Sequence, residues 1–180
     1  MHKLTARDVA WVGVMAALAI ALSFLEGLLP QLPFLPPGAK LGLSNLVVLY
    51  AAAGGSISRT MLIAFIKSMF VFLMRGPVAG TLSMTGGLLS AAVMVLCMRA
   101  PHARFSYLFV SVLGAVTHNL GQLLAASLLI GSAAAWGYLP FVLIAGTAMG
   151  AINGWVVRTI LPALGRVSRS SSPGGKHHPQ

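Results

Sequence analysis

The chain has 180 residues, of which 57% are hydrophobic, and its mean hydropathy is +0.88. Only 12 Lys and Arg and 2 Asp and Glu carry a formal charge, a balance of +10 at neutral pH. This composition excludes an ordinary water-soluble domain and predicts an integral, multi-pass protein of the cell membrane. The basic residues are scattered singly between apolar runs, which argues against nucleic acid as a partner and for the lipid bilayer as surroundings.

The scarcity of acidic and sulfur ligands restricts the chemistry that the chain can perform. Asp8 and Glu26 are the only acids, so no carboxylate pair and no Asp-rich magnesium site can form. The sequence also has no P-loop. Cys97 is the only cysteine, which excludes an internal disulfide and a cysteine-based metal site. We therefore predict that the chain is not an enzyme and has no metal site and no resident cofactor.

Apolar segments predict an all-α fold, a bundle of six transmembrane helices. A crossing takes about 20 apolar residues at about 1.5 Å rise each. The first segment is uninterrupted, so we interpret it as a retained span rather than a cleaved signal peptide. The second and third are short, which predicts small tilt, irregular helix or a pair buried within the bundle. The six predicted spans are residues 9–29, 41–53, 57–75, 81–98, 106–130 and 138–161.

Prolines, glycines and basic residues separate the spans. Four prolines between residues 30 and 37 predict an extended connection after the first span, and Arg75-Gly-Pro77 ends the third. Residues 1–165 are thus predicted to form one membrane domain. The segment 166–180 is rich in Ser, Gly and Pro, and we predict a disordered polar tail there.

The distribution of Lys and Arg predicts the orientation of the chain. An even number of spans places both termini on the same side of the membrane. If that side is the cytoplasm, only Lys40 and Arg75 among the basic residues near the spans lie at the outer edge. Because cytoplasmic loops carry the excess of Lys and Arg, we predict that the N-terminus and the C-terminus are both cytoplasmic.

The fifth predicted span carries polar residues along one stripe. At helical spacing Ser111, Gly114, His118 and Gln122 share a face, with Asn119 beside it. A polar group facing lipid would lack a partner, so this face is expected to lie against other helices or a cavity. For His118 two interpretations stay open, a ligand contact and an interhelical hydrogen bond.

Basic residues in the predicted outer half point to an anionic ligand. An ammonium at membrane depth costs about 2.5 to 3.5 kcal/mol, so Lys67 needs a partner. A pair with Glu26, or extension of the side chain to the outer interface, would satisfy Lys67 alone. One carboxylate cannot neutralise three cations, however, and the surplus predicts a small anionic ligand entering from outside. The candidate binding residues are Lys40, Asn45, Lys67, Arg75, His118, Asn119 and Gln122.

Two stripes of small residues concern packing. Small side chains at every fourth position let helices approach closely, either within the chain or against a partner membrane protein. Beside the second stripe, Asn153 is predicted to form an interhelical hydrogen bond. The stripes are Gly13, Ala17 and Ala21 in the first span, and Gly146, Gly150 and Gly154 in the last.

Three motifs in this order resemble a known bacterial family. They are Lys40-Leu-Gly-Leu-Ser-Asn45, Gly86-Gly-Leu-Leu-Ser90 and Gly114-Ala-Val-Thr-His-Asn-Leu-Gly-Gln122. On six short spans they resemble the heptaprenyl diphosphate synthase component I family, also called the Gx transporter family, over roughly residues 5–162. That family in turn resembles the S components of energy-coupling factor (ECF) transporters. These are six-helix membrane subunits that capture a vitamin or similar cofactor on the outer side.

The resemblance implies a function and partners. S components work with a scaffold membrane subunit and two ATPase subunits, so the chain would take up a small anionic or phosphate-bearing cofactor, vitamin or precursor. In S components small residues of the first helix contact the scaffold, which implies that role for Gly13, Ala17 and Ala21. The segment from Pro30 to Lys40 would correspond to the loop over the binding site. The alternative is a non-catalytic membrane accessory subunit of a polyprenyl diphosphate synthase, or of a flavin or quinone electron-transfer system.

Overall fold

The computed structural model describes residues 5–30, 42–54, 56–100, 105–131 and 133–170, and the elements within these ranges are helices. Lys40, the proline-rich connection from residue 31 onwards and the tail from residue 171 lie outside the described residues. The elements are α1 (Ala6–Leu28), α2 (Asn45–Ala53), α3 (Ile57–Arg99), α4 (Tyr107–Ile130), the 3₁₀ helix η1 (Ala133–Tyr138) and α5 (Leu139–Ser170).

Length and composition allow four of the described segments to cross a membrane. They are α1, α3, α4 and the stretch Ala134–Ile160, which joins η1 to most of α5. Large apolar side chains such as Val14, Leu73 and Ile144 lie on their outer surfaces, each more than half exposed. A water-soluble bundle would carry polar side chains there, so the outer surface of this bundle suits lipid.

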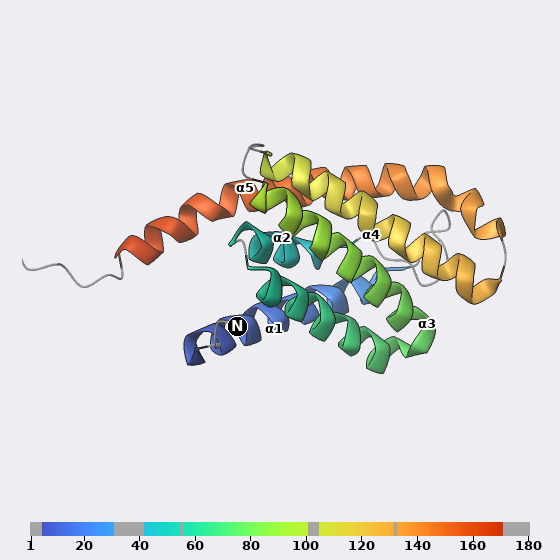
Figure 1. Ribbon diagram of the computed structural model, residues 1–180, viewed down its shortest axis with the longest axis horizontal. Coiled ribbons are helices and arrows are strands. Elements are labelled where there is room, and N and C mark those ends of the chain that lie inside the picture. The colour runs from blue at the N-terminus through green and yellow to red at the C-terminus, as the bar shows by residue number, and fades with distance from the viewer. Residues whose placement is uncertain (1–4, 31–41, 55, 101–104, 132, 171–180) are drawn as a thin grey trace, which may run out of the picture.

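The helix α3 is a hairpin that reverses at Gly76. A straight helix of its 43 residues would be about 65 Å long, roughly twice the apolar thickness of a bilayer. Gly76 has φ of +85°, a conformation that glycine adopts readily, and Pro77 begins the second arm. Ser68 Oγ donates to the backbone oxygen of Ser83 at 3.1 Å, which joins the two arms. The break predicted at Arg75-Gly-Pro77 is therefore present as the bend of this hairpin (Figure 1).

The short helix α2 lies in the middle of the bundle. It contacts α1, α3, α4 and α5, and Val47, Val48 and Leu49 are all buried (Figure 1). A helix of nine residues is only about 14 Å long, which is too short to span the apolar layer alone. One of the three outcomes predicted for the second and third spans was a pair buried within the bundle; α2 is buried, whereas the first arm of α3 exposes Phe65 and Leu73.

The two stripes of small residues have different surroundings. A Cβ on Gly150 would lie 2.6 Å from Val112 Cα, so the second stripe is where α5 packs closely on α4. On α1, in contrast, Gly13, Ala17 and Ala21 are exposed, and a Cβ on Gly13 would meet nothing within 4 Å. Internal packing thus explains the stripe on α5 but not the stripe on α1.

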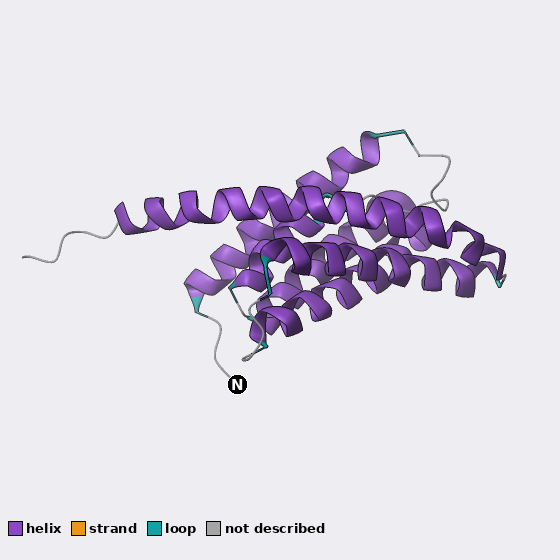
Figure 2. Ribbon diagram, turned by 90° about the horizontal axis from the view of Figure 1, so that it is seen from above, coloured by secondary structure: helices purple, strands orange, loops and turns teal. Residues whose placement is uncertain are grey.

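The first turn of α1 is tied to the start of α3. Thr5 and Asp8 form a capping box at the beginning of α1. Asp8 Oδ1 accepts a bond from Arg59 Nη1 at 3.2 Å, and the Arg59 guanidinium also lies 5.4 Å from the centre of the Trp11 ring. The start of α1 and the last turns of α5 lie at the same end of the bundle (Figures 1 and 2).

Two helix boundaries differ from the predicted spans. The helix α2 begins at Asn45 rather than at residue 41, because Gly42 has φ of +92° and forms a turn instead. The helix α5 continues to Ser170, past the predicted end of the last span at residue 161. It therefore includes the first residues of the segment 166–180 that the composition assigns to the tail.

Candidate ligand-binding site

Polar side chains from all five α-helices gather around the turn that precedes α2. They are buried within the bundle, with exposed fractions between 1% and 5%. This group is called the polar cluster below, and it lies between helices whose outer surfaces are apolar. Its members are the side chains of Glu26 of α1, Asn45 of α2, Lys67 of α3, His118 and Gln122 of α4 and Asn153 of α5, together with the backbone of Gly42 in the turn before α2.

Lys67 is buried on the first arm of α3. Its side chain is 1% exposed, so the ammonium stays inside the bundle rather than extending to the membrane surface. Lys67 Nζ donates to Asn45 Oδ1 at 3.1 Å. A Cβ on Gly87, in the second arm, would lie 3.9 Å from the same Nζ. Gly87 of the second arm thus packs directly beside the ammonium.

The bond from Lys67 fixes the orientation of the Asn45 amide. An ammonium can only donate, so the amide oxygen must face Lys67 and the amide nitrogen must point elsewhere. Asn45 Nδ2 is buried and has no hydrogen-bond partner among the described residues. An unpaired buried donor costs about 1 to 3 kcal/mol. This donor, beside an ammonium, is available to an oxygen atom of a ligand.

The turn at Gly42 joins three helices. Its N–H donates to Glu26 Oε1 at 2.5 Å, and its carbonyl oxygen accepts from Asn153 Nδ2 at 3.1 Å. The same oxygen accepts the Asn45 N–H at 2.9 Å. A Cβ on Gly42 would lie 2.9 Å from Asn45 Nδ2. The left-handed φ favours glycine, and the turn holds Asn45 in place beneath Lys67.

His118 and Gln122 form the α4 side of the polar cluster. Gln122 Nε2 donates to His118 Nε2 at 3.0 Å, one helical turn away. Gly86 of α3 packs against both, since a Cβ there would lie 2.5 Å from the His118 backbone oxygen and 3.0 Å from Gln122 Cγ. The adjacent glycines Gly86 and Gly87 thus face the two halves of the cluster, one towards α4 and one towards Lys67.

Asn119 faces away from this cluster although it neighbours His118 in the chain. Its Nδ2 donates to the backbone oxygen of Val142 at 3.0 Å, which ties α4 to α5. A Cβ on Gly146 would lie 2.8 Å from that nitrogen. The geometry gives Asn119 a role in helix packing.

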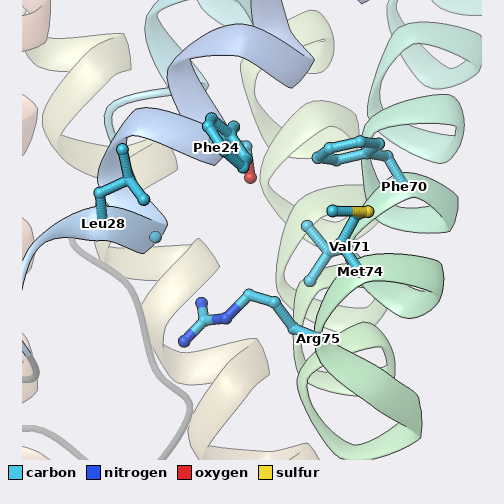
Figure 3. Close-up of a pocket in the computed structure, with 8 residues that line it drawn as sticks. Phe24, Leu28, Phe70, Val71, Met74 and Arg75 are labelled. Carbon is cyan, nitrogen blue, oxygen red and sulfur yellow. The ribbon is translucent and has the colours of Figure 1, made fainter.

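Arg75 lies at the end of the first arm of α3, outside the polar cluster. The residue is exposed, and its side chain extends towards the end of α1 (Figure 3). It lines a cavity of about 110 Å³ between α1 and α3. The seven candidates named from the sequence thus separate into four in the polar cluster, Asn119 between α4 and α5, Arg75 in the cavity between α1 and α3, and Lys40 outside the described residues.

Three members of the polar cluster were not among the predicted binding residues. Glu26 was considered only as a charge partner of Lys67, and Asn153 only as a bond between helices. Asn153 does bond across the bundle, to the Gly42 turn. Gly42 lies within the motif Lys40-Leu-Gly-Leu-Ser-Asn45, but a glycine between two leucines does not reveal that its own N–H and C=O are shared by two other helices.

The polar cluster holds both donors and acceptors. It provides one ammonium, three side-chain amides, one imidazole and one carboxylate, and Asn45 Oδ1 and Glu26 Oε1 already accept bonds from Lys67 and Gly42. Asn153 Oδ1 is a buried acceptor without a hydrogen-bond partner among the described residues. No group of three or more His, Cys, Asp and Glu side chains that could hold a metal ion occurs within the part of the chain that the structure describes. Lys67 Nζ and Asn45 Nδ2 are the two neighbouring donors from which an oxygen atom of a small ligand could accept.

Comparisons with known proteins place the fold and the family. A solved structure described as the S component of a bacterial ECF transporter is similar to this chain, with a TM-score of 0.61 and 15% sequence identity. The superposition covers 91% of this chain and 96% of that one. The two share a fold. No curated protein matches the sequence. The family model for heptaprenyl diphosphate synthase component I matches residues 15–160. The chain is a multi-pass membrane protein, and it belongs to the heptaprenyl diphosphate synthase component I family.

Proposed function

We propose that the protein is the membrane-embedded substrate-capture subunit of an ECF-type transporter, and that it binds a small anionic or phosphate-bearing cofactor, vitamin or precursor. The observation that carries the proposal is the buried pair of Lys67 Nζ and the unpaired donor Asn45 Nδ2. A phosphate or carboxylate oxygen would accept hydrogen bonds from both. The shared S-component fold supports this interpretation.

We place Lys67, Asn45, His118 and Gln122 in the binding site, with Lys40 at its mouth. The first four are buried members of the polar cluster. Asn119 is not placed in this binding site because its amide nitrogen donates to the backbone oxygen of Val142. Arg75 is not placed there because it lines the cavity between α1 and α3. The protein is not an enzyme in this proposal, since the cluster holds a single carboxylate and that group bonds to Gly42.

The proposal includes six crossings with both termini in the cytoplasm. The two arms of α3 would cross separately, and the short helix α2 would be the second of the six. A cysteine-free background made by Cys97→Ala can test this topology. Val78→Cys, beside the α3 bend, should react with a membrane-impermeant maleimide from outside, whereas Ser58→Cys should not. The reverse pattern of labelling would refute the orientation.

The exposed stripe of α1 is the proposed contact with the scaffold membrane subunit, which would bring two ATPase subunits. Small residues on a lipid-facing surface favour close packing against another helix. Gly13, Ala17 and Ala21 are exposed in the monomer, whereas the stripe on α5 is used within the chain. This contrast supports a partner for α1.

Native mass spectrometry of the gently purified protein, followed by denaturing extraction, tests the capture function. We expect a stoichiometric anionic small molecule whose retention falls at least about tenfold in Lys67→Met, which keeps the volume of the side chain and removes its charge. Ser90→Ala is the control, since it changes a buried polar residue of α3 whose Oγ has no partner among the described residues. Equal retention in wild-type protein and Lys67→Met would refute the site.

The family name favours a second candidate function, a non-catalytic membrane subunit that recruits a polyprenyl diphosphate synthase or an electron-transfer protein. The two candidates differ in what accompanies the purified protein. Capture predicts a bound small molecule, and a scaffold when the ECF module is coexpressed. Recruitment predicts a stoichiometric soluble enzyme and no cargo, and that result would replace the first proposal.

A further inference from the structure

A cavity opens between α1 and the first arm of α3, and no residue of the polar cluster lines it (Figure 3). It has a volume of about 110 Å³. An apolar cavity of about 150 Å³ holds a benzene molecule, so this one is large enough for part of a hydrocarbon chain. Its lining is mainly apolar and comes from both helices. The lining residues are Ser23, Phe24, Gly27 and Leu28 of α1, and Phe70, Val71, Met74 and Arg75 of α3.

Arg75 gives this apolar cavity a charged rim. Gly27 of α1 faces the arginine stem, since a Cβ there would lie 4.0 Å from Arg75 Cδ, an ordinary van der Waals distance. The guanidinium extends past the apolar side chains towards the end of α1 (Figure 3). A planar guanidinium can hold a phosphate with two parallel hydrogen bonds.

The position of the cavity in the bundle matches the edge of a bilayer. Both flanking segments end there, α1 at Leu28 and the first arm of α3 at the Gly76 bend. Phe24, Leu28 and Met74 are each about half exposed or more, so the cavity opens through an apolar surface of the kind that faces lipid. An occupant must therefore be apolar where it enters the cavity and anionic beside Arg75.

We propose that this cavity binds an anionic phospholipid of the surrounding bilayer, with its phosphate on Arg75 and an acyl segment between Phe24 and Met74. The charge of Arg75 selects the phosphate, and the apolar lining selects the acyl segment. The site is independent of the capture function, because none of its lining residues belongs to the polar cluster. On α1, Phe24 and Leu28 follow Ala21 on the same exposed face, so the lipid adjoins the stripe proposed for the scaffold.

Native mass spectrometry with phosphatidylglycerol and phosphatidylcholine tests the two parts of the site separately. Arg75→Gln removes the charge of an exposed side chain, and we expect the preference for phosphatidylglycerol over phosphatidylcholine to fall about tenfold. Gly27→Leu keeps Arg75 and fills the cavity, so we expect it to weaken the binding of both lipids. Arg99→Gln, at the far end of α3, is the matched control for loss of one positive charge.

Several outcomes would overturn the lipid site. Equal lipid preference in wild-type protein and Arg75→Gln would exclude Arg75 as the phosphate contact. An equal effect of Arg99→Gln would show that only the net charge matters. Loss of a soluble anionic molecule from Arg75→Gln, with lipid binding unchanged, would instead place Arg75 in the capture site. Failure of the capture experiment on Lys67→Met would leave the lipid result unaffected.

Discussion

Alanine at Gly150 of α5 and at Gly13 of α1 should change stability in opposite directions. In both helices alanine gains about 0.5 to 1 kcal/mol over glycine, because glycine loses more backbone entropy on folding. At Gly150 the added Cβ would lie 2.6 Å from Val112 Cα and 3.0 Å from the Ser111 backbone oxygen, atoms that cannot rotate away. Overpacking of this kind costs about 1 to 3 kcal/mol or more. At Gly13 the Cβ would meet nothing within 4 Å.

The difference between the two variants isolates the packing cost, since both share the gain in helix propensity. We expect Gly150→Ala to unfold about 2 to 12 °C below Gly13→Ala, from about 1 to 3 kcal/mol and about 2 to 4 °C for each kcal/mol. Thermal unfolding in one detergent, followed by tryptophan fluorescence, measures the difference. If the two variants melted together, the close approach of α4 and α5 at Gly150 would be wrong.

Three further substitutions probe the polar cluster, the α4–α5 contact and the scaffold stripe. Gly42→Ala should lower the free energy of unfolding by about 1 to 3 kcal/mol and abolish retention of the anionic ligand, because φ of +92° is unfavourable for alanine and the Cβ would meet Asn45. Thermal unfolding measures the first effect and native mass spectrometry the second. Intact retention would contradict the role of the turn. Asn119→Ala should cost about 0.6 to 1.7 kcal/mol through the lost bond to Val142 while ligand retention stays within twofold; a large loss of ligand would return Asn119 to the site. Ala17→Leu should leave the melting temperature unchanged and abolish copurification with a coexpressed scaffold, and unchanged copurification would move the interface elsewhere.

Sequence patterns predicted the helical membrane fold well where a single residue type decides the structure. Glycine at 76 and proline at 77 cannot continue a regular helix together, so the reversal of α3 was predictable from local chemistry. The exposed outer surfaces follow in the same way from the length of the apolar segments. The start of α2 was less predictable, because the left-handed conformation of Gly42 depends on bonds to Glu26 and Asn153, which lie far away in the sequence.

The candidate site was predicted in part, for a related reason. A buried lysine is costly in any membrane helix, so composition alone singled out Lys67, and helical spacing brought in His118 and Gln122. Helical spacing cannot show which of two nearby residues on a helix faces the site, however. Asn119 is one position from His118 but bonds to α5, and Arg75 shares α3 with Lys67 but lines the cavity between α1 and α3. The packing of α1 and α5 around these helices decides which partner each of these polar side chains contacts.

The helix α1 is the element where the proposed ligand site and the proposed partner surface meet. One face presents Gly13, Ala17 and Ala21 to the outside, and the other carries Glu26, which binds the Gly42 turn. That turn orients Asn45, which in turn accepts the bond from Lys67. A ligand can alter the affinity for a scaffold only through contacts that differ between the loaded and empty states. In the proposed function, an anion on Asn45 and Lys67 would act on the Gly42 turn, which bonds to α1 through Glu26, and this turn would connect capture with docking.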